Sequence, residues 1–158
     1  MAESTKRYNH TVIMSSSPSS AYLEGMNNDP SPASPGRLVR PRSSVPGEAE
    51  NVFTLIGDGD RSRSMVIVEN PYLGQDIYSR IEPGEYMMVR QGLPGDVLLL
   101  RLLAGTSVQP GDFVMTADYG FVQPISGTPS DGVIVGMSND YHDRSDTNVN
   151  SRFSVTLV

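Results

Sequence analysis

The chain contains no cysteine and no tryptophan, and each absence removes a class of function. Without cysteine, disulfide bonds and thiolate metal sites are excluded. The missing tryptophan counts against a carbohydrate-binding module, because sugar rings stack on large aromatic side chains. The longest apolar run, residues 97–100, ends at Arg101 and is far shorter than the roughly 18 residues that a membrane helix needs, so we expect no membrane association. Met1 leads into no apolar stretch of signal-peptide length, so we expect no secretion by that route.

Basic residues are also few and unevenly placed. One lysine and eleven arginines stand against eighteen acidic residues, which gives a net charge of −6. Residues 1–50 carry five basic and five acidic side chains, so the excess of negative charge falls on residues 51–158. Because phosphate binding depends on clustered positive charge, this distribution argues against a nucleic-acid partner. The preference for arginine favours protein interfaces, although a nucleotide-composition bias in the gene would produce it equally well.

The composition changes near residue 50. Residues 1–50 hold six of the twelve prolines and ten serines, whereas residues 51–158 read as short apolar runs separated by Pro-Gly and Gly. The proline-rich run 28–36 is predicted to be extended, because proline removes a backbone donor and restricts the residue before it. We therefore divide the chain into a long extended N-terminal arm, residues 1–50, and a β-rich domain, residues 51–158. The arm is either a plain disordered tail or a segment that orders against a partner.

Apolar residues in the arm favour the second interpretation. Tyr8, Val12 and Ile13 lie in the one stretch before residue 50 that has the composition of a strand, residues 8–14. Such a segment would anchor the protein by pairing with an exposed strand edge of a partner. We predict these three residues as partner-binding residues.

Arg37, Arg40 and Arg42 form the only basic cluster of the sequence. Aromatic residues are not interleaved with them, so the signal for nucleic-acid binding is weak. Two interpretations remain open: a segment that docks on an acidic patch of a partner protein, and a solvated linker. We include the three arginines among the predicted partner-binding residues.

The domain is predicted to be all-β, a small β-sandwich or β-barrel. Its apolar runs are short, rich in Val, Ile, Leu, Phe and Tyr, and bounded by Gly, Pro, Asp or Asn, which is typical of strands joined by turns. A short helix over residues 74–81 is the best helical candidate. The predicted strands cover residues 52–56, 64–69, 85–90, 96–103, 112–117, 120–123, 132–136 and 153–158.

Three Pro-Gly dipeptides, each followed by an acidic residue, precede predicted strands. Proline followed by glycine suits the two central positions of a type II turn, where the glycine takes a positive φ. We therefore predict three turns of one design at the start of three strands. They are Pro83-Gly84-Glu85, Pro94-Gly95-Asp96 and Pro110-Gly111-Asp112.

Residues that carry catalysis or bind metals are scarce. His142 lies among Asp140, Asp143 and Asp146, which is compatible with a general base or a metal site but is predicted to be a solvated loop between strands. His10 lies in the arm, where fixed catalytic geometry is hard to hold. The pair at residues 58 and 60, Asp-Gly-Asp, lacks the spacing of a calcium loop and favours a turn. We predict no enzyme, no catalytic or metal residues and no cofactor.

The second half of the domain resembles the small β domains of tailed-phage capsid decoration proteins, also called cement proteins. The resemblance rests on residues 103–114, on Asp118-Tyr119-Gly120-Phe121-Val122-Gln123-Pro124, on residues 132–138 and on residues 154–158. It implies a structural protein on the outer surface of an icosahedral virion, bridging and stabilising subunits of the major capsid protein. It also implies assembly in the host cytoplasm and a homo-oligomer, with a trimer favoured by analogy.

Other functions stay open beside this one. The main alternative is a β-sandwich binding module or fibre-like module on a virion or cell surface. A small β-barrel enzyme, such as a trimeric nucleotide hydrolase, would need Asp, Ser and Gly motifs that the sequence does not show. A phage tail or neck component is a further alternative.

Overall fold

The computed structural model describes residues 12–15, 22–42, 52–57, 65–125, 134–144 and 152–158. These residues form thirteen strands and two short 3-10 helices, and the predicted all-β fold is confirmed. In chain order the elements are β1 (Ile13–Ser15), β2 (Tyr22–Asn27), β3 (Leu38–Pro41), β4 (Val52–Leu55), β5 (Met65–Val68), η1 (Pro71–Leu73), β6 (Tyr86–Arg90), β7 (Val97–Arg101), β8 (Thr106–Val108), β9 (Phe113–Thr116), η2 (Asp118–Gly120), β10 (Val122–Pro124), β11 (Ile134–Ser138), β12 (His142–Arg144) and β13 (Arg152–Leu157).

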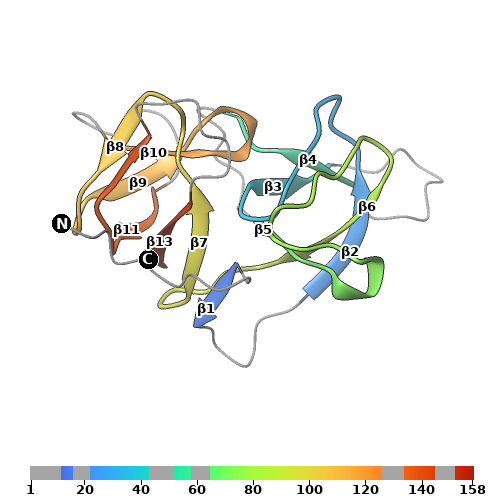
Figure 1. Cartoon of the computed structure of the whole chain (residues 1–158), viewed down its shortest axis with the longest axis horizontal. Coiled ribbons are helices and arrows are strands. Elements are labelled where there is room, and N and C mark those ends of the chain that lie inside the picture. The colour runs from blue at the N-terminus through green and yellow to red at the C-terminus, as the bar shows by residue number, and fades with distance from the viewer. Residues whose placement is uncertain (1–11, 16–21, 43–51, 58–64, 126–133, 145–151) are drawn as a thin grey trace.

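The strands make a barrel and a sheet that lie side by side (Figure 1). Five strands close the barrel in the order β2-β4-β3-β5-β6, and β6 pairs with β2 to complete it. Only the β2–β4 pair of the barrel is parallel. The second half of the chain supplies all but one strand of an antiparallel sheet in the order β1-β7-β13-β11-β9-β10, with β12 and β8 as a separate ladder. Of the two expected architectures, the barrel is present, and a six-stranded sheet lies next to it.

Strand β5 shows why barrel and sheet stay together. All four of its residues are buried, although side chains alternate between the two faces of a strand. Met65 and Ile67 pack in the barrel interior, whereas Val66 and Val68 belong to a second apolar cluster. A strand buried on both faces must be apolar throughout, which explains the uninterrupted sequence Met-Val-Ile-Val.

The second cluster is the core that barrel and sheet share. Leu38 and Ile56 come from the barrel side, and Leu100, Phe153 and Val155 come from the sheet. Phe153 is completely buried there, as is Leu100. Because residues from both halves fill one cluster, neither half can lose the other without exposing apolar surface.

The three predicted Pro-Gly turns are present. Gly84, Gly95 and Gly111 have φ values of 89°, 92° and 92°. In each turn the acidic residue donates its backbone N–H to the residue three positions earlier, at 3.0 Å. Its carboxylate also accepts the N–H of that earlier residue, at 2.9–3.0 Å. The acidic residue therefore closes the turn with both its backbone N–H and its carboxylate, which explains why an acidic residue follows Pro-Gly in all three turns.

The prediction of an extended arm is wrong for residues 22–42. Strands β2 and β3 belong to the barrel, and the proline-rich loop between them is held by reciprocal backbone hydrogen bonds of Ala33 and Ile81, both at 2.8 Å. Pro35-Gly36 makes a fourth turn of the Pro-Gly type, with φ of 88° at Gly36. Prolines are compatible with this loop because carbonyls and the remaining N–H groups carry its hydrogen bonds.

The helix predicted over residues 74–81 is also wrong. The short helix η1 ends at Gly74, whose φ of 69° is left-handed, and turns follow it up to Ile81. The eight predicted strands correspond to β4, β5, β6, β7, β9, β10, β11 and β13.

Candidate functional site

The predicted anchors Val12 and Ile13 lie against the chain's own sheet. Val12 is completely buried, and its carbonyl accepts the N–H of Leu99 at 2.7 Å. Its N–H donates to the Glu69 carboxylate at 3.1 Å. Ile13 pairs with Leu98 and packs on the shared core. The segment does add a strand to a sheet edge, but the edge is β7 of the same chain. Tyr8 lies outside the described residues.

The three predicted docking arginines occupy different surroundings. Arg40 and Arg42 are exposed, in agreement with a role at the surface. Arg37 is half-buried and donates from Nε to the Tyr119 carbonyl at 2.8 Å and from Nη1 to the Pro32 carbonyl at 2.9 Å. Its guanidinium also stacks on a ring, as described below. Arg37 is therefore held in place by backbone carbonyls of two other loops.

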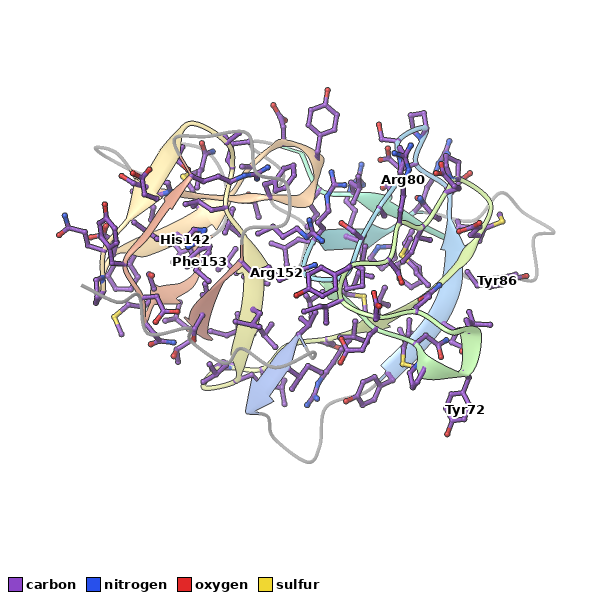
Figure 2. All side chains as sticks on the ribbon, in the orientation of Figure 1. Tyr72, Arg80, Tyr86, His142, Arg152 and Phe153 are labelled. Carbon is purple, nitrogen blue, oxygen red and sulfur yellow. The ribbon has the colours of Figure 1, made fainter. Side chains whose placement is uncertain are left out.

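Arg37 belongs to a cluster of four arginines that sequence reasoning missed. The others are Arg101 at the end of β7, Arg144 at the end of β12 and Arg152 at the start of β13. Figure 2 shows Arg152 at the junction of sheet and barrel. Arg101 donates from Nε to the Pro35 carbonyl at 3.1 Å, and Arg144 donates to the Leu102 carbonyl. We call these four residues the arginine cluster.

Burial and mutual repulsion set the electrostatics of the cluster. Burial and, to a lesser extent, the charges of Arg152, Arg37 and Arg144 together lower the pKa of Arg101 to about 9. Burial lowers the pKa of Arg37 to about 10, against the opposing effect of Asp29. Burial likewise lowers the pKa of Arg152. The arginine charges therefore repel one another within the cluster.

Aromatic rings cover the guanidinium planes. The Phe121 ring lies between two arginines, with its centroid 4.6 Å from the Arg37 guanidinium carbon and 4.9 Å from that of Arg144. Arg152 stacks on Tyr78 at 5.2 Å. Such cation–π contacts fix the orientation of each guanidinium and replace part of the water that it would otherwise bind. A ring does not neutralise the charge of the guanidinium that it covers.

Next to the cluster, the surface is hollowed by a groove of about 460 Å³. We call it the arginine groove, and define it by Arg37, Arg80, Arg101, Tyr78, Phe121 and Ser34. Arg80 lies at its exposed rim and pairs with Glu82 at 2.6 Å. The groove is the place in the described part of the chain where several cations, hydroxyls and aromatic rings face one space.

A strained turn supports the groove. Tyr119 has a φ of 59°, which is unusual for a residue other than glycine, and Gly120 follows with a φ of 75°. The Tyr119 carbonyl accepts the Arg37 Nε, and Gly120 donates its N–H to the Ile56 carbonyl at 2.7 Å. Strain of this kind persists where the surroundings determine the conformation, and it is often found at functional sites.

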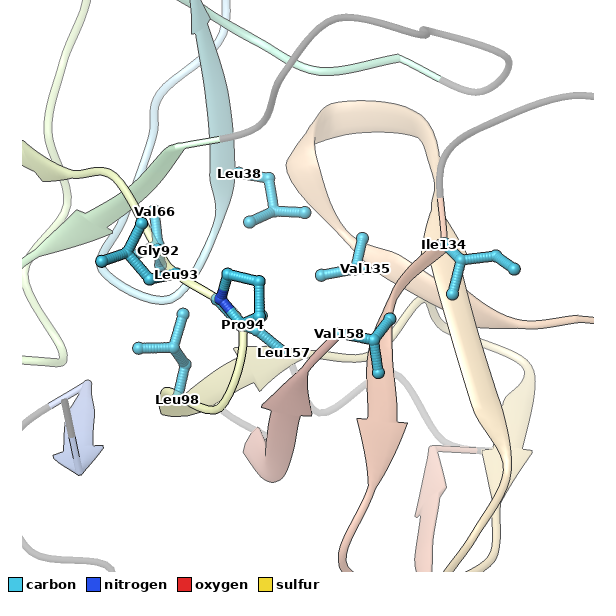
Figure 3. Close-up of a pocket in the computed structure, with 10 residues that line it drawn as sticks. All are labelled: Leu38, Val66, Gly92, Leu93, Pro94, Leu98, Ile134, Val135, Leu157 and Val158. Atoms are coloured by element: carbon cyan, nitrogen blue, oxygen red, sulfur yellow. The ribbon is translucent and has the colours of Figure 1, made fainter. Parts of the chain in front are cut away.

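A second hollow is lined by apolar side chains. It has a volume of about 220 Å³ and lies between the barrel and the sheet, where Leu38 and Val66 face Leu98 and Leu157 (Figure 3). Gly92 belongs to its wall, since a Cβ there would lie 2.2 Å from the Leu157 Cδ1 atom. The ten residues that line it carry no polar side chain, so it offers no group for chemistry.

Tyr72 and Tyr86 lie exposed on the side of the barrel away from the sheet (Figure 2), and exposed Leu73, next to Tyr72 in the chain, lines one hollow with Tyr86. Tyr72 is 92% exposed and extends from η1. Exposed apolar surface of this kind is typical of contact sites between proteins. We call it the tyrosine patch.

His142 has a structural place. It belongs to strand β12 and stacks on Phe153, with centroids 5.8 Å apart and ring planes at 13°. Asp140 is buried, and its carboxylate accepts the N–H of Ser154 at 3.1 Å. The predicted solvated loop is therefore wrong for residues 142–144. In the described part of the chain, no group of three His, Asp or Glu side chains could hold a metal ion. Asp146 and His10, and the predicted Asp-Gly-Asp turn at residues 58–60, lie outside the described residues.

Comparison with known proteins finds a similar fold. The chain matches no family model and no curated protein sequence. No helix among the described residues has the length and apolar character to cross a membrane.

The fold is similar to a solved structure described as the N base of head fiber gp8.5 in bacteriophage phi29, with a TM-score of 0.57 and 12% sequence identity. The similarity covers 88% of this chain and 94% of that one, so the two share barrel and sheet rather than a single motif.

Proposed function

We propose that this protein is a structural component of a phage virion, which attaches to the outside of the capsid as the base of a head appendage. The observation that carries the proposal is the fold similarity to a phage head-fibre base, which extends over nearly the whole of both chains. The resemblance of residues 97–158 to capsid decoration proteins points to the same surface from the sequence alone.

Within this proposal, the major capsid protein is the partner. The tyrosine patch and the exposed Arg40 and Arg42 are the candidate contact residues on the barrel, because aromatic side chains and arginine contribute disproportionately to protein interfaces. Tyr8 is proposed as an additional anchor. A homo-oligomer, with a trimer favoured, would bind the shell through several such contacts at once, so each one need only be weak.

The first experiment is co-sedimentation of the full-length protein with mature phage shells that lack it. The proposal expects saturable binding, and sedimentation of the free protein gives the number of copies in the oligomer. A protein that does not bind these shells at any ratio would contradict the proposal. Bovine serum albumin at equal concentration serves as the control for trapping in the pellet.

The same mixtures distinguish a cement protein from an appendage base. A cement protein binds at most positions of the shell and raises its disruption temperature, because it stabilises the assembled state by mass action. An appendage base can saturate at few positions and leave the disruption temperature unchanged. The fold similarity favours the second outcome.

A further inference from the structure

Four apolar side chains on the outer face of the sheet belong to neither core cluster. Phe113 and Met115 lie on β9, and Ile134 and Met137 lie on β11. In the register of the two strands, Met137 is the partner of Phe113 and Ile134 is the partner of Met115. Cross-strand partners share one face of a sheet, and so do residues two apart in a strand, so the four side chains are neighbours. We call these four residues the apolar block.

A change of register brings the last member of the block to the surface. The pairing of β11 with β9 shifts by one residue between Ile134 and Gly136, as in a β-bulge. With strict alternation Ile134 and Met137 would point to opposite faces, because they are three residues apart. Both are exposed, at 41% and 37%, whereas Val135 between them is buried in the shared core. Bulges that redirect a side chain in this way are typically found where it has a function.

The position of the bulge is fixed by close packing of strands. A Cβ at Gly136 would lie 2.3 Å from the Thr156 carbonyl oxygen, which is a backbone atom of β13. Strand β11 therefore approaches β13 too closely at this point for any residue with a side chain. Because β11 pairs with β13 on one edge and with β9 on the other, the exposure of Ile134 is determined by the sheet itself.

The block and the side chains next to it carry no charge. Its neighbours across the adjacent strands are Gln123 on β10, opposite Met115, and Thr156 on β13, opposite Met137. The chain has a net charge of −6, so two copies repel one another at long range. A surface where copies meet must avoid placing like charges opposite one another, and this face meets that condition.

We propose that the apolar block is the surface through which copies of this protein associate, with like blocks packed against one another at the axis of the oligomer. Phenylalanine and methionine are enriched in the centre of protein interfaces, and interfaces between identical subunits are more apolar than others. A block of one Phe, one Ile and two Met has that composition. The inference rests on the homo-oligomer of the proposed function, but not on binding to a shell.

A second copy suits this surface better than the shell does. The candidate shell contacts Tyr72 and Tyr86 lie on the side of the barrel away from the sheet, whereas β9 and β11 belong to the sheet (Figure 1, Figure 2). A protein attached through the barrel therefore keeps the block available. Ile134 also lines the apolar hollow, so the uncharged surface continues from the block to the junction with the barrel (Figure 3).

A matched pair of variants tests the block. Ile134→Asp places a charge in it, and Leu23→Asp places the same charge on the barrel at a position of equal exposure, 40% against 41%. Sedimentation between about 1 µM and about 1 mM gives the dissociation constant of the oligomer. Ile134→Asp should weaken association about thirtyfold or more, because the interface would bury an unpaired charge, and Leu23→Asp at most about threefold. Met137→Glu is the second block variant in case Ile134→Asp fails to fold by circular dichroism.

Methionine methyl NMR signals locate the interface without any substitution in it. Met115 and Met137 belong to the block, whereas Met87 is completely buried in the barrel and serves as the internal reference. On dilution, the signals of Met115 and Met137 should shift and that of Met87 should not. A shift of the Met26 signal on β2, with Met115 and Met137 unchanged, would place the interface on the barrel and overturn the inference.

The outcomes separate this inference from the proposed function. If the protein binds shells but stays monomeric, or if the block variants associate as well as the natural protein, the inference fails and attachment to the shell stands. If the protein associates through the block but binds no shell, the proposed function fails and the inference stands. If the block variants lose shell binding and keep self-association, the block belongs to the shell interface and its assignment to a second copy is wrong.

Discussion

The substitution Gly120→Ala offers a sharp test of how barrel and sheet are joined. Gly120 ends η2, which packs on β3 and β4. A Cβ at this position would lie 2.5 Å from the Leu38 carbonyl oxygen and 3.0 Å from the Leu38 nitrogen. Both atoms belong to the backbone of β3, so no side-chain rotation can relieve the overlap. The substitution should force the turn away from the barrel.

The expected cost follows from comparison with Gly74. Its φ of 69° is close to the 75° of Gly120, but no atom lies within 4 Å of a Cβ at Gly74. A left-handed alanine costs about 1–2 kcal/mol, partly offset by about 0.4–1 kcal/mol of reduced freedom in the unfolded chain. Gly74→Ala should therefore lower the free energy of unfolding by about 1 kcal/mol. Gly120→Ala adds an overpacking cost of about 1–3 kcal/mol, for a total near 3 kcal/mol.

Urea denaturation of the two variants beside the natural protein measures the difference. With a slope of about 2 kcal/mol per molar urea, the midpoint should fall by about 0.5 M for Gly74→Ala and about 1.5 M for Gly120→Ala. Fluorescence and circular dichroism should give one common transition, because barrel and sheet share a core. Equal midpoints for the two variants would refute the tight junction at Leu38.

Three further predictions concern the core, the turns and the arginine cluster. Phe153→Ala should cost roughly 3–5 kcal/mol because the ring is completely buried, whereas Phe113→Ala, at 48% exposure, should change stability by about 0.5 kcal/mol or less in thermal unfolding. Asp112→Ala should cost about 1 kcal/mol by removing the 2.9 Å hydrogen bond to the Gln109 N–H, and an unchanged melting temperature would contradict the capping role. Burial lowers the pKa of Arg101 to about 9 in the folded protein, well below its ordinary value, so above about pH 9 the unfolded chain binds more protons and this group makes stability rise with pH. Denaturation at about pH 8 and pH 10 should show a smaller gain for Arg101→Met than for the natural protein; an equal gain would contradict the lowered pKa.

The strands that were predicted from sequence are those whose residues pack on a core along most of their length. Val52–Leu55, Met65–Val68 and Val97–Arg101 are almost wholly apolar, and their burial follows directly. Strand β2 was missed because only its second half is buried, and its first three residues are exposed. Its pairing with β4 is parallel, and the β2–β6 pair closes the barrel over about sixty residues of chain, which no local pattern records.

The candidate site was predictable only at Arg37. Its partners in the arginine cluster are distant in sequence and meet because β13 inserts beside β7 and because η2 brings Phe121 against β3. One signal was present: Arg101 directly follows four apolar residues in a buried strand, where a charged side chain is unexpected. The predicted grouping of Arg37 with Arg40 was based on proximity in sequence, but the two residues lie in different surroundings.

The position of β13 also determines the order in which the protein can form on the ribosome. All barrel strands lie between Tyr22 and Arg90, so they are synthesised before most of the sheet exists. Strand β13 lies between β7 and β11 in space but follows both in the chain. Until residues 152–157 emerge, the strand between β7 and β11 is missing, and the edges of both strands that pair with it are open. Open edges are where strands of neighbouring chains pair, so a chain that stops before Arg152 would be especially prone to aggregate.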